Sequence, residues 1–166
     1  MEIQPVHMNH LEEVFNIFQN CKRTMENEDI FQWTENYPRV EHLSEDISQR
    51  HLYGLYKQKQ CLGVISLNTI QDPQYKLISW EDMNGKPLII HRFAVEPSFQ
   101  HLGLGRKLMD FAEEYAIKGT YTSIRFDAYS GNQRALKFYE KRRYLKKGKV
   151  YFPGRDLPFY CFEKLI

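Results

Sequence analysis

The sequence predicts an α/β fold, in which a mixed, mostly antiparallel central sheet of about six to seven strands carries helices on both faces. Three observations indicate this class. The chain has 166 residues, a length at which a single core buries roughly 68–70% of the unfolded chain's surface. Short β-forming segments alternate with segments of helical periodicity. No repeat or linker divides them, so we expect one domain over residues 1–166.

The first half of the chain begins with a short strand and two helices. Leu11, Val14, Phe15 and Phe18 recur at helical spacing behind Asn9, a residue type that favours the N-cap. Strand-like segments separated by turn signals follow. The expected elements are a strand over 2–6, a helix from Asn9 to about Lys22, a helix with Pro38 in its first turn, and strands over 52–56, 61–70 and 87–95.

The second half contains the clearest helix. Apolar residues recur at helical spacing from Leu104 to Ala116, and Gly119 is the expected C-terminal stop. Residues 124–129 alternate as a strand does, and Asn132 then opens another helix. Strands are expected from Tyr144 to the end of the chain.

Composition excludes several classes of protein. No apolar run approaches the roughly 20 residues of a membrane span, and the acidic N-terminal segment does not resemble a signal peptide. We therefore expect a cytoplasmic protein. The three cysteines are far apart and odd in number, which predicts neither a disulfide framework nor a metal site. A net charge of +2 does not indicate nucleic acid as a partner.

A glycine-bearing turn between a strand and a helix carries the strongest functional signal. The segment Gln100–Lys107 reads QHLGLGRK and lies between the strand ending at Val95 and the helix starting near Leu104. The first turn of a helix offers unpaired N–H groups, and glycines let a pyrophosphate approach the backbone. Arg106 and Lys107 add positive charge.

Two nucleotide-binding motifs fit this turn poorly. A P-loop requires Gly-Lys-Ser/Thr after four intervening residues, which is absent. A dinucleotide fingerprint requires a third Gly or Ala at position 108, where the chain has Leu108.

The segment resembles the acetyl-CoA motif of the GNAT superfamily of N-acetyltransferases, Gln/Arg-x-x-Gly-x-Gly/Ala. Gln100, Gly103 and Gly105 match it. Phe93-Ala94-Val95-x-Pro97 before it and the segment 132–141 after it, NQRALKFYEK, strengthen the likeness. Residues 88–145 resemble the family closely, and the first 80 only in outline. One departure is Arg143-Tyr144, where the family commonly has Gly-Phe; a left-handed Arg143 would cost roughly 1 kcal/mol relative to Gly.

The resemblance implies acetyl transfer from acetyl-CoA as co-substrate to an amine, without a metal. It assigns backbone N–H groups of the strand before the motif to the pantetheine arm and the acetyl oxygen. The cofactor-binding residues expected on this basis are Phe93, Ala94, Val95, Gln100, His101, Leu102, Gly103, Leu104, Gly105, Arg106, Lys107, Asn132, Ala135 and Phe138.

Two residues are predicted to be catalytic. Tyr139 matches the family position whose phenol protonates the departing thiolate, although its ring also suits packing. His91 lies two residues before Phe93, hence on the same strand face unless a bulge intervenes, and its pKa range suits a general base. Glu81 and Asp127 are lesser candidates for the base, and Asp127 also suits a structural role beside Arg125.

The resemblance implies that the amine lies between the loop joining the first two helices and the late strands. Acidic and aromatic groups together attract a cationic amine, although such a loop can also be merely solvated. The residues predicted to bind it are Glu28, Trp33, Tyr37 and Tyr151. The basic run over 141–149 either meets the 3′-phosphate of coenzyme A, contacts RNA or is solvated, and we favour solvation.

Several functions stay open at this stage. A primary amine of a small molecule is the favoured acceptor, with direct transfer and no covalent enzyme intermediate. The alternatives are a protein N-terminus or lysine as acceptor, and a non-catalytic module that binds acyl-CoA. Neither the acyl chain preference nor the oligomeric state is determined, so a homodimer stays open.

Overall fold

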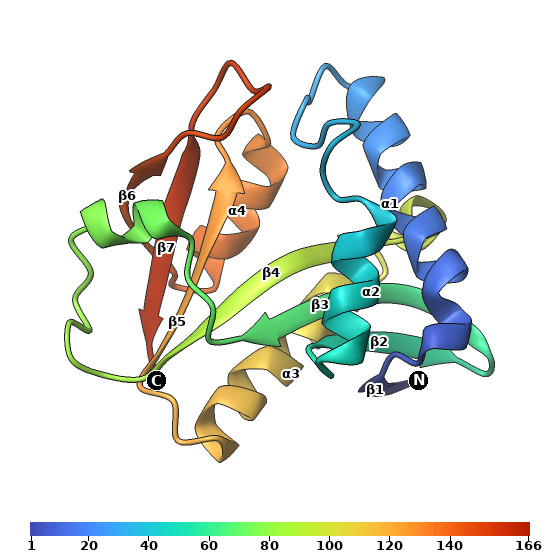
Figure 1. Cartoon of the computed structure of the whole chain (residues 1–166), viewed down its shortest axis with the longest axis horizontal. Helices are drawn as coiled ribbons and strands as arrows, with labels where there is room; N and C mark the ends of the chain where they lie inside the picture. The colour runs from blue at the N-terminus through green and yellow to red at the C-terminus, as the bar shows by residue number, and fades with distance from the viewer. The chain divides into compact units, whose positions relative to one another are not determined.

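The computed structural model describes residues 1–166 and contains seven strands and four α-helices (Figure 1). The element order is the one predicted, β-α-α-β-β-β-α-β-α-β-β. Three short 3₁₀ helices lie between these elements: η1 (Met8–His10), η2 (Pro73–Leu77) and η3 (Pro97–Phe99). The contacts divide the chain into two compact units, one of residues 1–68 and 90–112 and the other of residues 69–89 and 113–166. That the whole chain acts as one domain stays a prediction.

The seven strands form a mixed sheet of order β1-β2-β3-β4-β5-β7-β6. β4 contributes its second part to the first unit and Pro87–Ile89 to the second. The pairing of β4 with β5 is parallel, whereas β1–β2, β2–β3, β5–β7 and β6–β7 are antiparallel. The predicted fold class is thus confirmed. The strands are β1 (Glu2–Pro5), β2 (Leu52–Lys57), β3 (Gln60–Asn68), β4 (Pro87–Val95), β5 (Ser123–Tyr129), β6 (Leu145–Val150) and β7 (Phe159–Leu165).

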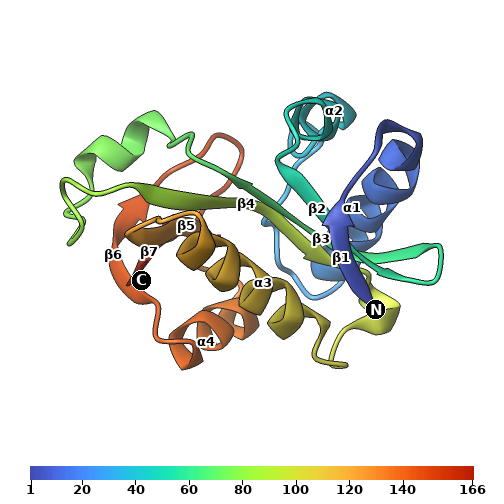
Figure 2. The same ribbon diagram turned by 90° about the horizontal axis from the view of Figure 1, so that it is seen from below.

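In the first unit, helices cover both faces of the strands (Figure 2). α1 (Leu11–Glu26) and α2 (Val40–Ser48) bury Phe18 and Leu43 in a core that also contains Val64 of β3. The first part of α3 (Leu104–Lys118) packs on the opposite face, where the rings of Phe111 and Tyr53 lie 5.1 Å apart. Burial of these apolar side chains is the main source of the unit's stability.

In the second unit, α4 (Gln133–Lys141) covers one face of β5 and β7. The Tyr139 ring lies 4.5 Å from that of Phe126 and 5.9 Å from that of Phe162. On the other face of β5, the segment after β3 contributes Tyr75 and Trp80, whose rings lie 5.2 Å apart. β5 is therefore covered on both sides.

Two predicted helix starts differ from the structure. Asn9 does not cap α1, because the 3₁₀ helix η1 (Met8–His10) occupies that position and the N-cap is His10. Pro38 lies outside α2, whose N-cap is Arg39. In both cases the chain enters the helix through an irregular segment that sequence periodicity does not reveal. α1 also extends beyond the predicted Lys22 to Glu26.

All four α-helices end in the same hydrogen-bonded turn with a left-handed residue that is not glycine. In each turn, the N–H of the left-handed residue donates to the carbonyl of the residue three positions before it. The N–H of the following residue donates to the carbonyl five positions before that residue. Gly119 precedes the left-handed residue of α3, so the predicted stop is displaced by one position. Arg143 is left-handed, which is the conformation whose cost was considered for it. The four residues are Asp29 (φ 58°), Arg50 (φ 58°), Thr120 (φ 56°) and Arg143 (φ 65°).

Candidate active site

The turn before α3 contains two left-handed residues. Pro97–Phe99 forms the 3₁₀ helix η3, and His101 (φ 64°) and Gly103 (φ 78°) follow. A Cβ atom on Gly103 would meet no heavy atom within 4 Å, so glycine is favoured here by its backbone conformation and not by close packing. The surface over this glycine is therefore open to a ligand.

The N-terminus of α3 lies directly behind this turn. The first helical hydrogen bond joins the Lys107 N–H to the Gly103 carbonyl at 3.2 Å. The preceding N–H groups have no partner within the helix and carry its partial positive charge. Leu104 and Leu108 are buried and hold the helix, whereas the side chains of Arg106 and Lys107 are exposed. This arrangement suits an anionic group such as a pyrophosphate.

The end of β4 is fixed by hydrogen bonds to one carbonyl. The Val95 carbonyl accepts from the Gln100 side-chain amide at 3.0 Å and from the Cys21 thiol at 3.1 Å. The next residue is held as well, because the Glu96 N–H donates to the Leu62 carbonyl at 2.9 Å. Gln100 therefore joins the glycine turn to the strand that precedes it.

Gly63 of β3 lets β4 approach closely. A Cβ atom at this position would lie 2.9 Å from the Ala94 carbonyl oxygen and 3.3 Å from the Val95 Cα. Only glycine fits without displacing the strand. The positions of Ala94 and Val95 thus depend on a residue that the sequence motif does not include.

The backbone of β4 is irregular next to His91, the predicted general base. Arg92 has a left-handed backbone (φ 35°), which interrupts the two-residue alternation expected between His91 and Phe93. The His91 ring is half-buried, and its Nε2 lies 3.0 Å from the Asn68 side-chain oxygen. A catalytic His91 stays a prediction, but the argument that placed it on the same strand face as Phe93 no longer holds.

In the second unit, α4 presents the predicted acid. Tyr139 is half-buried among aromatic rings, and burial, followed by the nearby Asp127 charge, raises the pKa of its phenol above the ordinary range. The phenol therefore keeps its proton at neutral pH. Asn132 caps the helix by accepting the Ala135 N–H at 3.1 Å, and Ala135 and Phe138 are half-buried on α4.

Asp127 is a carboxyl of this unit whose pKa is raised. One of its carboxylate oxygens accepts the Tyr75 hydroxyl at 2.7 Å. Burial raises the pKa of the carboxyl to about 6, against the opposing effect of the Tyr75 hydrogen bond. Arg125, which the sequence suggested as its neighbour, pairs instead with Glu163 at 3.0 Å. Asp127 thus combines a desolvated carboxyl with a pKa near neutrality.

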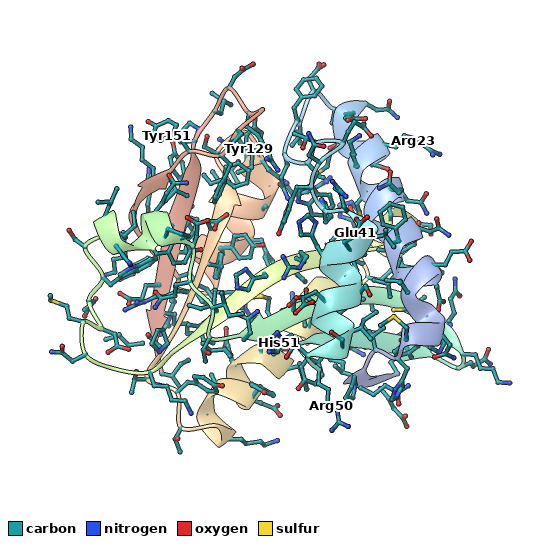
Figure 3. The ribbon with its side chains drawn as sticks, viewed as in Figure 1. Arg23, Glu41, Arg50, His51, Tyr129 and Tyr151 are labelled. Atoms are coloured by element: carbon teal, nitrogen blue, oxygen red, sulfur yellow. The ribbon has the colours of Figure 1, made fainter.

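The residues predicted to bind the amine lie in different environments. Glu28 is exposed just beyond α1, and Tyr37 is half-buried in the segment 27–39 that joins α1 to α2. Trp33 is only 8% exposed and packs on Phe18, with ring centroids 5.1 Å apart, so its ring belongs to the core. Tyr151, which is labelled in Figure 3, is 57% exposed. Its backbone N–H and carbonyl each form a hydrogen bond with the Gln74 side chain.

The basic run over 141–149 is partly engaged by interactions within the unit. Arg142 pairs with Glu113 at 2.9 Å, and Lys147 pairs with Glu81 at 2.7 Å. The Lys146 ammonium lies 3.2 Å from the centroid of the Tyr160 ring. These contacts leave fewer charges for a phosphate or a nucleic acid than the sequence suggests.

Sequence reasoning missed three parts of this arrangement. Nothing in the local sequence signals the Cys21 thiol bond to β4 or the requirement for Gly63, because both partners are distant along the chain. Tyr75 was also missed. Its only local signal is an aromatic residue directly after the Asp72-Pro73 turn, which does not reveal the Asp127 partner.

A strand, a left-handed glycine turn and the N-terminus of a helix follow one another here, which is an arrangement that suits a phosphorylated ligand. Residues 11–144 match the model of the acetyltransferase (GNAT) family. The chain belongs to this family.

Curated relatives agree with this assignment. An uncharacterised N-acetyltransferase from Lactobacillus delbrueckii subsp. lactis is 32% identical over 90 residues, which are 54% of this chain and 49% of that protein. The chain thus matches about half the length of this relative. The uncharacterised N-acetyltransferase YesJ from Bacillus subtilis is 23% identical over 76% of this chain and 68% of its own.

Solved structures share the fold. A GNAT-family acetyltransferase from Streptococcus agalactiae has a TM-score of 0.85 at 18% identity, over 99% of this chain and 95% of its own. The ribosomal-protein-S18-alanine N-acetyltransferase from Escherichia coli has a TM-score of 0.72 at 15% identity, over 99% and 93%. At these identities the likeness concerns the fold alone. No helix of the chain is long and apolar enough to cross a membrane.

Proposed function

We propose that this chain transfers an acetyl group from acetyl-CoA directly to a primary amine of a small molecule. The observation that carries the proposal is the turn at His101–Gly103, which opens at the N-terminus of α3 in a chain of the GNAT family. Exposed N–H groups and the flanking Arg106 and Lys107 suit the pyrophosphate of coenzyme A.

The N–H groups of Phe93–Val95 are proposed to bind the pantetheine arm and the acetyl oxygen. A main-chain donor fixed in advance stabilises the developing oxyanion without reorganisation. The hydrogen bonds that fix the Val95 carbonyl, from Gln100 and Cys21, support this role because they hold the strand end in one position.

Asp127 is proposed as the proton acceptor and Tyr139 as the proton donor. The amine must lose a proton as its nitrogen bonds the acetyl carbon, and the departing thiolate must gain one. A carboxyl with a pKa of about 6 is a better base than an ordinary aspartate. The raised pKa of the Tyr139 phenol keeps it protonated at neutral pH, so that it holds the proton that the thiolate needs. Asp127 replaces His91 as our preferred base.

The cysteines do not support a covalent intermediate. Burial raises the pKa of the Cys61 thiol to about 12 and also raises the pKa of the Cys161 thiol. A thiolate is the reactive form. Direct transfer therefore agrees better with these surroundings, and replacement of all three cysteines by serine should leave turnover in place. Free thiols also agree with the proposed cytoplasmic location.

The proposal is tested by thiol release from acetyl-CoA in the presence of a panel of primary amines. Gly103→Ala should raise the KM for acetyl-CoA about tenfold, because the left-handed conformation costs alanine roughly 1–2 kcal/mol more than glycine. Gly154→Ala is the matched control, since Gly154 has nearly the same backbone angle (φ 77°) outside the motif. Equal effects of the two substitutions would contradict the proposed role of the turn.

The acceptor class is tested with a cell extract and isotope-labelled acetyl-CoA. Label in metabolites would support a small amine, whereas label in proteins would favour a protein N-terminus or lysine. Label in neither fraction, with acetyl-CoA bound, would favour a non-catalytic module.

A further inference from the structure

Arg92 is a cation inside β4 whose backbone is strained. Its φ of 35° is uncommon for a residue with a side chain, and its side chain is only 12% exposed. Such a conformation persists when surrounding contacts fix it, and it is frequent at functional sites. Arg92 directly precedes Phe93, the first residue proposed to bind the pantetheine arm.

The contact that fixes Arg92 is a buried ion pair with α2. Arg92 Nε donates to Asp46 Oδ2 at 2.5 Å, and Nη2 donates to Asp46 Oδ1 at 2.7 Å. The Asp46 side chain is 5% exposed. This planar, two-pronged pair requires arginine, because a lysine ammonium cannot reproduce its geometry. It attaches β4 to the helix that follows the segment 27–39.

The third nitrogen of the Arg92 guanidinium reaches that segment. Arg92 Nη1 donates to the Tyr37 hydroxyl at 3.0 Å. The Tyr37 ring packs 5.1 Å from that of His42 on α2, and the Tyr37 backbone exchanges two hydrogen bonds with Thr34. The guanidinium thus sets the position of a phenol in the segment expected to meet the amine.

We propose that Arg92 is a positioning residue that sets where the amine is held relative to the acetyl group. Its backbone continues into Phe93–Val95, while its side chain fixes Tyr37, so one residue determines both positions. The inference rests on the proposed function and adds to it a determinant of amine binding. Tyr37 contacts the amine, and Arg92 acts through Tyr37 and Asp46.

The first test is Tyr37→Phe, which removes a single hydroxyl from a half-buried ring. The KM for the amine should rise about tenfold, the usual effect of one lost hydrogen bond to a charged group. The KM for acetyl-CoA should change less than twofold. Equal changes in both constants, or none in either, would overturn the proposal.

The second test separates the side chain of Arg92 from its backbone. Arg92→Gly and Arg92→Ala are each combined with Asp46→Asn, so that no uncompensated charge stays buried. Both variants should raise the KM for the amine. Only the alanine variant should also raise the KM for acetyl-CoA, because glycine alone keeps the left-handed angle readily. Arg50→Gly is the control, since Arg50 is exposed and left-handed (φ 58°).

Amide hydrogen exchange tests the clamp without turnover. In the Arg92→Gly/Asp46→Asn variant, the N–H groups of Thr34 and Tyr37 should exchange at least about tenfold faster than in the wild type, because the segment opens locally. Exchange between β2 and β3 should stay unchanged. Unaltered exchange at Thr34 and Tyr37 would overturn the inference. Absence of turnover in the wild type would contradict the proposed function alone.

Discussion

Replacement of Asp127 by asparagine should make the protein more stable and less active. The carboxyl is desolvated, and its one hydrogen bond is the Tyr75 hydroxyl at 2.7 Å. An asparagine carbonyl can accept the same bond without placing a charge in this environment. The substitution therefore removes the cost of a buried charge together with the proposed base.

The size of the stability effect follows from the pKa of Asp127. Folding raises this pKa from 3.8 to about 6, and at about 1.4 kcal/mol per unit the shift corresponds to about 3 kcal/mol. Because the residue is partly exposed, this is an upper value. The folded state binds the proton more tightly, so the wild type has its full stability below pH 3.8 and loses it as the pH rises through 6.

Urea unfolding of the wild type and Asp127→Asn between pH 4 and 8 measures this effect. The two proteins should differ little near pH 4, and the variant should be more stable above pH 7 by up to about 3 kcal/mol. Its turnover should fall about 10²–10⁴-fold, the usual contribution of a general base. A pH-independent difference in stability would refute the pKa argument, and unchanged turnover would refute the catalytic role.

Three further substitutions address the proposed acid, the β3–β4 contact and the end of α4. Tyr139→Phe should lower kcat by about 10²–10⁴-fold while calorimetry shows an unchanged Kd for acetyl-CoA; unchanged kcat would exclude the acid role. Gly63→Ala places a Cβ atom 2.9 Å from the Ala94 carbonyl oxygen and should weaken acetyl-CoA binding about tenfold. Unchanged binding would show that β4 shifts at no cost and that Gly63 does not fix the strand. Arg143→Gly should raise the free energy of unfolding by about 0.5–1 kcal/mol. Lys141→Gly, inside α4, is the control and should lower the free energy of unfolding by a similar amount. A loss of stability in Arg143→Gly would show that the left-handed residue is not strained.

The sequence was informative wherever structure depends on neighbours along the chain. Alternation predicted β5, and helical spacing predicted α3. The glycine turn was recognised because Gln100, Gly103 and Gly105 resemble the acetyl-CoA motif of the GNAT family. The departure from that family at Arg143 marked the end of α4, where the structure has a left-handed residue.

The parts that could not be predicted depend on contacts distant in sequence. The raised pKa of Asp127 requires Tyr75, which lies 52 residues away. The pairing of Arg92 with Asp46 joins residues 46 apart. The prediction that His91 and Phe93 lie on the same face of β4 was also lost, because side chains alternate between faces only in a regular strand and the backbone at Arg92 is irregular.

Thermal unfolding with and without acetyl-CoA tests the central claim most directly. Acetyl-CoA at about 100 times its Kd should stabilise the protein by roughly 2.7 kcal/mol, whereas NADH and ATP at equal concentration should not match this shift. At the same acetyl-CoA concentration the shift should fall to about half in Gly103→Ala and persist in full in Gly154→Ala. No shift with acetyl-CoA, or a larger one with NADH, would contradict the assignment of the turn at His101–Gly103 to coenzyme A.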